Sequence, residues 1–338
     1  IYILIFFNSN LLSVENNKIL KVGLLVPLSG VYSELGSSIL YSLQLALEEI
    51  DDKNISIVPR DSGFNDKEKL NNAIQDIRSQ GVKIIIGPIR YEEFEDAGKY
   101  DDLIFISPSN INSEFTKKLA AEKGCDHKKI HVINPGINEP KTISAEADHQ
   151  AREIFGNSDI KIITVSRFDK RKGIDFSLLA LKNIQAIYPN FKYVIVGNGD
   201  EEENLKKTTK TFNLENNVTF LKNISFDLKN ALLKNSNIFL MPARIEGTSV
   251  EGFGISYIEA ASYGIPSIAG KDGGAPDAVL DNKTGLLCNG YDHSEIYDAL
   301  KNIIQNKKYL ELGKNAKEFS KQFYWKEIIK KYANILSL

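Results

Sequence analysis

Apolar and polar residues alternate in blocks along the first third of the chain, and the blocks have the lengths of strands and helices. Four short apolar runs predict buried strands, at residues 21–28, 55–61, 82–88 and 102–108. Between them, residues 36–50 and 68–80 space apolar side chains three and four positions apart, as in a helix with one buried face. A short acidic segment, 92–100, is predicted as a further helix. Strands that alternate with helices indicate a parallel sheet with right-handed crossovers.

The second half of the chain repeats this alternation with stronger signals. Strands are predicted at residues 161–167, 192–199, 217–221, 237–243, 266–270 and 284–288. Helices are predicted at 174–187, 202–211 and 227–235, near 254, and from 294 onward. The stretch 107–138, rich in Ser, Asn, Pro and Lys, separates the halves. The pattern predicts an α/β chain of two Rossmann-like lobes, each built on a parallel sheet.

The composition excludes some classes of function. The 338 residues give room for two domains, and 42% apolar with 25% charged residues is an ordinary globular profile. Lys and Arg number 42 and Asp and Glu 44, and the resulting net charge of −2 argues against a nucleic-acid partner. Cys125 and Cys288 form neither a metal-ligand spacing nor a disulfide framework, so both are expected to be free thiols. The histidines, which also lack ligand spacing, are His127, His131, His149 and His293.

An apolar stretch, "IYILIFF", opens the chain and leads into an Asn-rich segment. It is too short to cross a membrane, and no other segment could cross one. Residues 1–17 read either as the end of a secretory signal whose beginning is missing, or as a buried first strand from a truncated gene.

Two carboxylates eight positions apart, Glu251 and Glu259, stand out in "EGFGISYIE". The preceding strand ends at the carboxyl edge of its sheet, the edge where open α/β sheets bind ligands. A helix start near Gly254 would leave the N–H groups of Phe253, Gly254 and Ile255 unpaired, which favours an anion. Glu251 precedes the helix and Glu259 lies inside it. We therefore expect the two carboxylates to contact opposite ends of one elongated ligand.

A cationic cluster follows the first strand of the same half, in "SRFDKRKGID". Arg167 and Lys172 would lie at the carboxyl end of that strand, in the same crevice as the glutamates. Guanidinium and ammonium groups both bind phosphate oxygens, and a helix N-terminus adds to them. The pattern predicts a diphosphate site that needs no metal. The alternative is a solvated run of charges.

Residues from about 125 to 338 resemble the donor-binding lobe of GT-B glycosyltransferases of family 4. The matching motifs, in the expected order, are "SRFDKRKG", "YVIVGNGDEEENL", "NVTFL", "IFLMPARIEG", "EGFGISYIE", "AASYGIPSIAG", "GGAPDAVLDNKTGLL" and "FYWKEIIKKY". The wording "VEGFGISYIEA…GGAPDAV" is most similar to mannosyltransferases that act on phosphatidylinositol-type lipids. The resemblance implies a GT-B-type second lobe and a retaining transfer of a hexose, of the mannose or glucose type, from a GDP- or UDP-linked sugar to a lipid or glycan. It implies no further cofactor.

The resemblance also implies roles for single residues. Arg167 and Lys172 would neutralise the donor diphosphate as it leaves. Glu251 would bind the sugar hydroxyls and Glu259 the ribose. Backbone amides of Phe253, Gly254 and Ile255 would contact sugar and phosphate, while Gly197 and Asn198 would line the nucleoside side. No protein nucleophile is expected.

The first third resembles a different family, the type I periplasmic binding proteins, which include leucine-binding proteins and activators of penicillin-binding proteins. The matching motifs across about residues 18–110 are "VGLLVPLSGVYSELG", "ALEEI", "ISIVPRDSG" and "GVKIIIGP". The resemblances divide the chain into a signal-like segment (1–17), a partial binding-protein lobe (18–110), a junction (111–140) and a transferase lobe (141–338). Both parent halves are incomplete by comparison with their families.

Two readings of this junction stay open. The chain is either a chimera of two gene fragments or a real fusion in which a small lobe replaces the acceptor lobe. As a glycosyltransferase it would be inactive if the acceptor lobe is missing. The alternative function is an extracytoplasmic binding-protein fragment without catalysis. The transferase reading implies the cytoplasm or peripheral contact with the cytoplasmic membrane face, whereas the front lobe implies the periplasm, and the two conflict.

Overall fold

The computed structural model describes residues 19–63, 66–89, 93, 99–100, 102–106, 131–247 and 249–336. The predicted signal-like segment, most of the predicted junction and most of the acidic segment 92–100 lie outside these residues, as do Cys125 and His127. The chain forms two compact units, Asn134–Ile328 and the remainder (Ile1–Ile133 with Ile329–Leu338). Each unit is described by itself.

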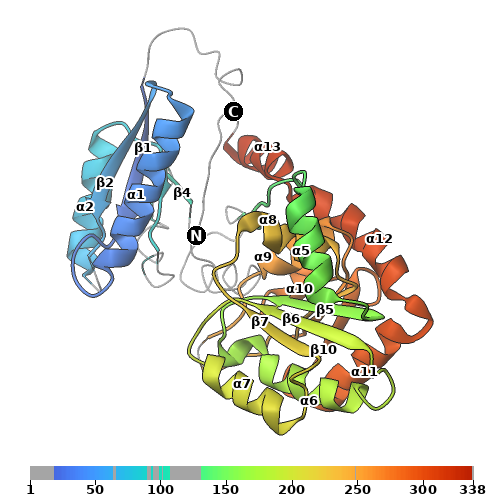
Figure 1. The fold of residues 1–338 in the computed structure, drawn as a ribbon. Coiled ribbons are helices and arrows are strands. Elements are labelled where there is room, and N and C mark those ends of the chain that lie inside the picture. Colours follow the sequence, from blue (N-terminus) through green and yellow to red (C-terminus); the bar gives the residue numbers. More distant parts are fainter. Residues whose placement is uncertain are drawn as a thin grey trace. The chain divides into compact units, whose positions relative to one another are not determined.

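The first unit contains a four-stranded parallel sheet in the order β2-β1-β3-β4 (Figure 1). Its strands are β1 (Leu20–Val26), β2 (Ile55–Asp61), β3 (Ile84–Ile86) and β4 (Ile104–Ile106). The α-helices described in this unit are α1 (Ser33–Ile50) and α2 (Lys67–Ser79). Successive side chains of β1 enter different cores, Leu24 with α1 and Leu25 with α2, so both faces of the strand are dry. This two-sided burial explains the continuous apolar run in the sequence.

Asp61 ties together the loops at the carboxyl edge of this sheet. Its Oδ1 accepts from the Leu28 amide at 2.9 Å and the Gly63 amide at 3.0 Å. Its Oδ2 accepts from Ser29 Oγ and Lys69 Nζ, both at 2.6 Å. Burial alone would raise the pKa of Asp61, but these four hydrogen bonds outweigh it and hold the pKa well below its usual range.

The second unit contains a six-stranded parallel sheet in the order β10-β9-β8-β5-β6-β7. Its strands are β5 (Ile160–Val165), β6 (Phe191–Val196), β7 (Val218–Leu221), β8 (Ile238–Met241), β9 (Ser267–Gly270) and β10 (Gly285–Cys288). Its helices begin with α5 (Ala145–Phe155), the 3₁₀ turn η3 (Lys170–Lys172), α6 (Ile174–Ile184), α7 (Glu202–Thr211), α8 (Phe226–Lys234), α9 (Ile255–Ser262) and α10 (Ala275–Ala278). They continue with α11 (His293–Ile304), η4 (Gln305–Lys307), α12 (Tyr309–Ser320) and η5 (Lys321–Phe323). Helix α13 (Trp325–Leu336) begins in this unit, and its residues after Ile328 belong to the first unit. Helices cover both faces of the sheet (Figure 1).

The strand order reverses at the centre of this sheet. From β5 the chain builds outward to β6 and β7, and then returns to place β8 on the other side of β5. The loops after β5 and β8 therefore leave the carboxyl ends of two adjacent strands, at the edge where open α/β sheets bind ligands. The segments that carry Arg167, Lys172 and Glu251 are these two loops.

Most predicted elements are confirmed, and α7 has the predicted bounds. The α/β class with two parallel sheets is confirmed as well. Helix α5 was not predicted, because two of its three buried positions, Ala147 and Ala151, carry small side chains that give little apolar contrast. Ser144 caps it by accepting from the Ala147 amide at 3.1 Å.

Candidate functional site

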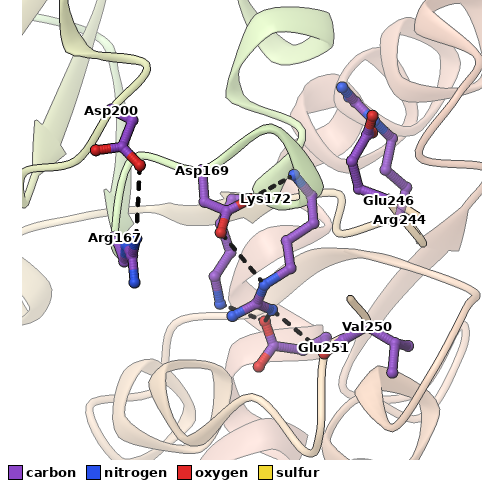
Figure 2. Close-up of polar contacts among 9 residues, drawn as sticks. Arg167, Asp169, Lys172, Asp200, Arg244, Glu246, Val250 and Glu251 are labelled. Atoms are coloured by element: carbon purple, nitrogen blue, oxygen red, sulfur yellow. Dashed lines mark hydrogen bonds and ion pairs between the residues drawn. The ribbon is translucent and has the colours of Figure 1, made fainter. Parts of the chain in front are cut away.

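A buried cluster of charge joins the two central loops. Lys172 Nζ, from η3, donates a hydrogen bond to Glu251 Oε2 (Figure 2). Arg171 Nη1 donates to the same oxygen at 2.9 Å. The side chains of Lys172 and Glu251 are only 9% and 10% exposed. Among the described residues, Glu251 Oε1 has no donor. The carboxylate is thus held by one oxygen, while the other has no partner within the described part of the chain.

The η3 turn presents Lys172 to this cluster. Asp169 caps the turn by accepting from the Arg171 amide at 3.1 Å, and Gly173 ends it at a φ of 68°. Burial lowers the pKa of Lys172, and the attraction of Glu251 opposes this without cancelling it. The net effect is a pKa of Lys172 below its usual value.

Gly273 and Gly274 hold the backbone of Glu251. The Gly274 amide donates to the Glu251 carbonyl at 2.8 Å. A Cβ on Gly274 would stand 1.7 Å from the Gly252 carbonyl oxygen, so no other residue fits. Gly273 is at φ 68°, and its Cβ would stand 2.6 Å from the Glu251 carbonyl oxygen. Close packing against the loop therefore requires glycine at both positions, and the positive φ of Gly273 favours it there as well.

Helix α9 begins where the sequence predicts a helix start. Gly254 precedes it in the left-handed region at φ 81°, and a Cβ there would stand 2.3 Å from the Tyr257 ring. The N–H groups of Phe253, Gly254 and Ile255 have no acceptor within the part of the chain that the structure describes. They remain available to an anion, as such a helix start allows.

Arg167 stands apart from the Lys172–Glu251 cluster. Its Nη2 lies 3.6 Å from Asp200 Oδ2, and the two side chains are 67% and 95% exposed (Figure 2). Such an exposed pair is weak. Arg167 lines a cavity of about 380 Å³ at the carboxyl ends of β5 and β6. The other lining residues are Val165, Ser166, Val196, Gly197, Asn198, Asn223, Ile224, Ser225, Phe226 and Lys229.

Gly197 and Asn198, predicted for the nucleoside side, lie in the wall of this cavity. Gly197 is at φ 147°, and a Cβ there would stand 1.9 Å from the Ser166 carbonyl oxygen. Glu259, from α9, forms an ion pair of 2.8 Å with Lys229, which lines the cavity from α8. The two glutamates of "EGFGISYIE" thus have different cationic partners, Lys172 with Arg171 for the first and Lys229 for the second.

Sequence reasoning missed Arg171, Lys229 and Arg244. Arg171 stands in the predicted charge run, but the run alone does not show which of its cations turns inward. Lys229 pairs with a carboxylate 30 positions away, and no local pattern signals that. Arg244, 5% exposed, makes a bidentate pair with Asp175 at 2.8 and 2.9 Å. Its amide donates to the Arg171 carbonyl at 2.8 Å, which joins the loop after β8 to η3.

Within the described ranges, no group of three or more His, Cys, Asp or Glu side chains could hold a metal ion. The helices of these ranges also include none with the length and apolar content needed to span a bilayer. Cys288 is a buried free thiol, and His149 makes an exposed contact of 3.5 Å with Glu153.

The fold defines a class: α/β proteins with two parallel sheets, of the GT-B type. Solved structures of similar fold include a glycosyltransferase from Rickettsia africae ESF-5, with a TM-score of 0.70 and 21% identity over 95% of this chain and 99% of that one. Anabaena Alr3699/HepE in complex with UDP is another, with a TM-score of 0.68 and 18% identity over 94% and 99%. At these identities the likeness shows the fold alone.

The sequence comparisons identify the family. The model "Glycosyl transferases group 1" matches residues 146–319, and the model "Periplasmic binding protein" matches residues 19–125. The chain belongs to the group 1 glycosyl transferases, and both resemblances seen in the sequence are confirmed.

Two curated relatives are similar over about two thirds of the chain. The GDP-mannose-dependent alpha-(1-6)-phosphatidylinositol monomannoside mannosyltransferase of Mycobacterium tuberculosis (strain CDC 1551 / Oshkosh) is 30% identical over 66% of this chain and 60% of its own length. The protein of the same name in Mycolicibacterium smegmatis is 28% identical over 64% and 56%. The chain thus spans less than two thirds of the length of these relatives.

Proposed function

We propose that the second unit binds a nucleotide-diphosphate sugar, and that the chain transfers the hexose to a lipid or glycan acceptor with retention of configuration. The observation that carries this proposal is the pairing of a nucleoside-sized cavity with a buried carboxylate held by two cations. The cavity is lined by the loops after β5, β6 and β7 and by α8, and the carboxylate lies on the loop after β8, so both lie at the carboxyl edge of the same sheet.

The diphosphate would bind to the groups that the protein leaves unsatisfied. Arg167 is exposed and, among the described residues, is held by a weak pair with Asp200, so it can turn to a phosphate at little cost. The amides of Phe253, Gly254 and Ile255 and the start of α9 supply further positive potential. Lys172 would shift from Glu251 toward the leaving phosphate. With these charges from the protein, we propose that no metal is needed.

The sugar would lie at Glu251. Two cations hold Oε2, and Oε1 has no donor among the described residues, so Oε1 is available to accept from sugar hydroxyls. The nucleoside would occupy the cavity beside Gly197 and Asn198, with Glu259 on the ribose. The protein would supply no nucleophile. The phosphate would assist the reaction on one face of the sugar, and transfer would need an acceptor about 3 Å from the anomeric carbon.

The names of the relatives support GDP-mannose as the donor and a phosphatidylinositol mannoside as the acceptor. The structure of Anabaena Alr3699/HepE contains UDP, so we propose a UDP-sugar as the alternative donor. Because nucleotide sugars are cytosolic and the acceptor would be a lipid, we propose action in the cytoplasm or at the cytoplasmic membrane face. A second function, ligand binding without catalysis, is favoured by the match of residues 19–125 to periplasmic binding proteins.

A transfer assay tests the proposed activity. The full chain would be incubated with radiolabelled GDP-mannose or UDP-glucose and phosphatidylinositol monomannoside, and labelled lipid would be measured. We expect Lys172→Met to lower the rate by roughly 10²–10³-fold, because it removes a charge that stabilises the leaving diphosphate. Lys170→Met changes an exposed lysine of the same turn. Like ordinary surface substitutions, it should change the rate by less than about twofold. No transfer from either donor would contradict the proposed activity.

A further inference from the structure

Lys229 contacts two residues of the second unit, Glu259 and Phe226. Its Nζ lies 2.8 Å from Glu259 Oε1 and 4.0 Å from the centroid of the Phe226 ring. Its side chain is 13% exposed, against 59% for Lys222 and 40% for Lys206. Lys229 and Phe226 both line the cavity. The ammonium is thus fixed between an aromatic face and a carboxylate at the cavity wall.

The ion pair restricts Glu259 and leaves part of it accessible. Oε1 accepts from Lys229, while Oε2 has no donor among the described residues, and the side chain is 27% exposed. A free glutamate on a helix surface would lose rotamer freedom when it bound a ligand. A carboxylate that is already held by a lysine loses less, so the same hydrogen bonds give tighter binding.

We propose that Lys229 is a positioning residue that orients Glu259 for the two ribose hydroxyls of a nucleoside diphosphate. The inference rests on the proposed function, because it concerns the nucleoside end of the same site. Lys229 acts through Glu259. The two adjacent hydroxyls of a ribose can both donate hydrogen bonds to a single carboxylate whose orientation is fixed.

A lysine that only joined α8 to α9 would behave differently. Its loss would lower the stability of the fold and would weaken the binding of every nucleotide by the same factor. A positioning lysine acts on the ribose contact alone. The readout that separates the two roles is therefore the ratio of affinities for a ribonucleotide and its deoxy form.

The test is calorimetry on the full chain with GDP, UDP and ADP, each beside its 2′-deoxy and 3′-deoxy forms. The wild type should prefer the ribo form of its best nucleotide by about tenfold to a hundredfold, the effect of a hydrogen bond to a charged group. Lys229→Met should reduce this preference to about twofold or less, and Lys229→Arg should restore most of it. Lys182→Met is the matched control, since Lys182 lies 5.0 Å from the Phe212 ring outside the cavity, and it should change nothing.

Two results would overturn the inference, and they differ in meaning. If the wild type binds a nucleoside diphosphate and Lys229→Met keeps the full ribose preference, the positioning role is wrong while the proposed function stands. If the wild type binds none of the three nucleotides, the proposed function fails and the inference fails with it.

Discussion

Replacing Glu251 with leucine is expected to lower the free energy of unfolding of the second unit by about 3–5 kcal/mol, the cost of removing one partner from a buried ion pair. Glu251 is the acceptor for both Lys172 and Arg171, and Lys172 is only 9% exposed. Without the carboxylate, a cation would be left in a nearly dry site. Removing the cation as well, in Lys172→Met with Glu251→Leu, should recover much of the loss.

The loss should also depend on pH, in a direction set by Lys172. Burial already lowers the pKa of this amine in the folded chain, and without Glu251 the pKa would fall further. The unfolded chain then binds more protons than the folded one across the interval between the two pKa values, so stability rises with pH there. Glu251→Leu should therefore be less destabilising at pH 9 than at pH 6.

Urea unfolding followed by tryptophan fluorescence measures both effects. The single tryptophan, Trp325, packs against Gly136 in the second unit. Glu318→Gln is the matched control, because Glu318 is 74% exposed and pairs only with Lys321 among the described residues. It should cost no more than about 0.5 kcal/mol. An equally small cost for Glu251→Leu would contradict the description of this cluster.

The second large effect is expected from Gly274→Ala, which adds a single methyl group. That methyl would stand 1.7 Å from the Gly252 carbonyl oxygen, and backbone on both sides leaves no flexible atom to give way. The loop that carries Glu251 would have to move and would lose its hydrogen bond from the Gly274 amide. We expect a loss of several kcal/mol, on the order of 3, and loss of nucleotide-sugar binding.

Gly264→Asn is the comparison for this substitution. Gly264 also has a special conformation, φ 81°, but the nearest atom to its Cβ is 3.6 Å away. Asparagine tolerates this region of φ, so Gly264→Asn should lower the free energy of unfolding by about 1 kcal/mol. Unfolding curves of the two variants decide the matter, and equal stability of Gly274→Ala and wild type would show that the loop is not held as described.

The inner strands of the sheets could be predicted because they are buried on both faces. Such strands appear as short apolar runs between turn residues, as β6, β8 and β9 do. Helix α5 could not be predicted in the same way, because alanines form most of its buried face. Burial by small side chains leaves little trace in a hydropathy pattern.

The site was predictable only in part, because its contacts join distant positions. The sequence indicated that Lys172 and Glu251 lie at one sheet edge, since each follows a strand of the same parallel sheet. It did not indicate that they touch across 79 positions, or that Arg171 shares the contact. It also grouped Arg167 with Lys172, whereas the structure pairs Arg167 with Asp200 at the surface. Which cation of a run turns inward depends on the cap and turn of η3 and not on spacing.

The central claim is that the second unit binds a nucleoside diphosphate through Arg167 and its neighbours. Calorimetric titration of GDP, UDP and ADP into the full chain, in the presence of EDTA, tests it most directly. We expect one of the three to bind, and Arg167→Ala to weaken that binding by about tenfold to a hundredfold through loss of charge-assisted hydrogen bonds. Arg152→Ala, which removes an arginine of equal exposure (67%) from α5, should bind as the wild type does. Failure of the wild type to bind any of the three nucleotides would contradict the claim.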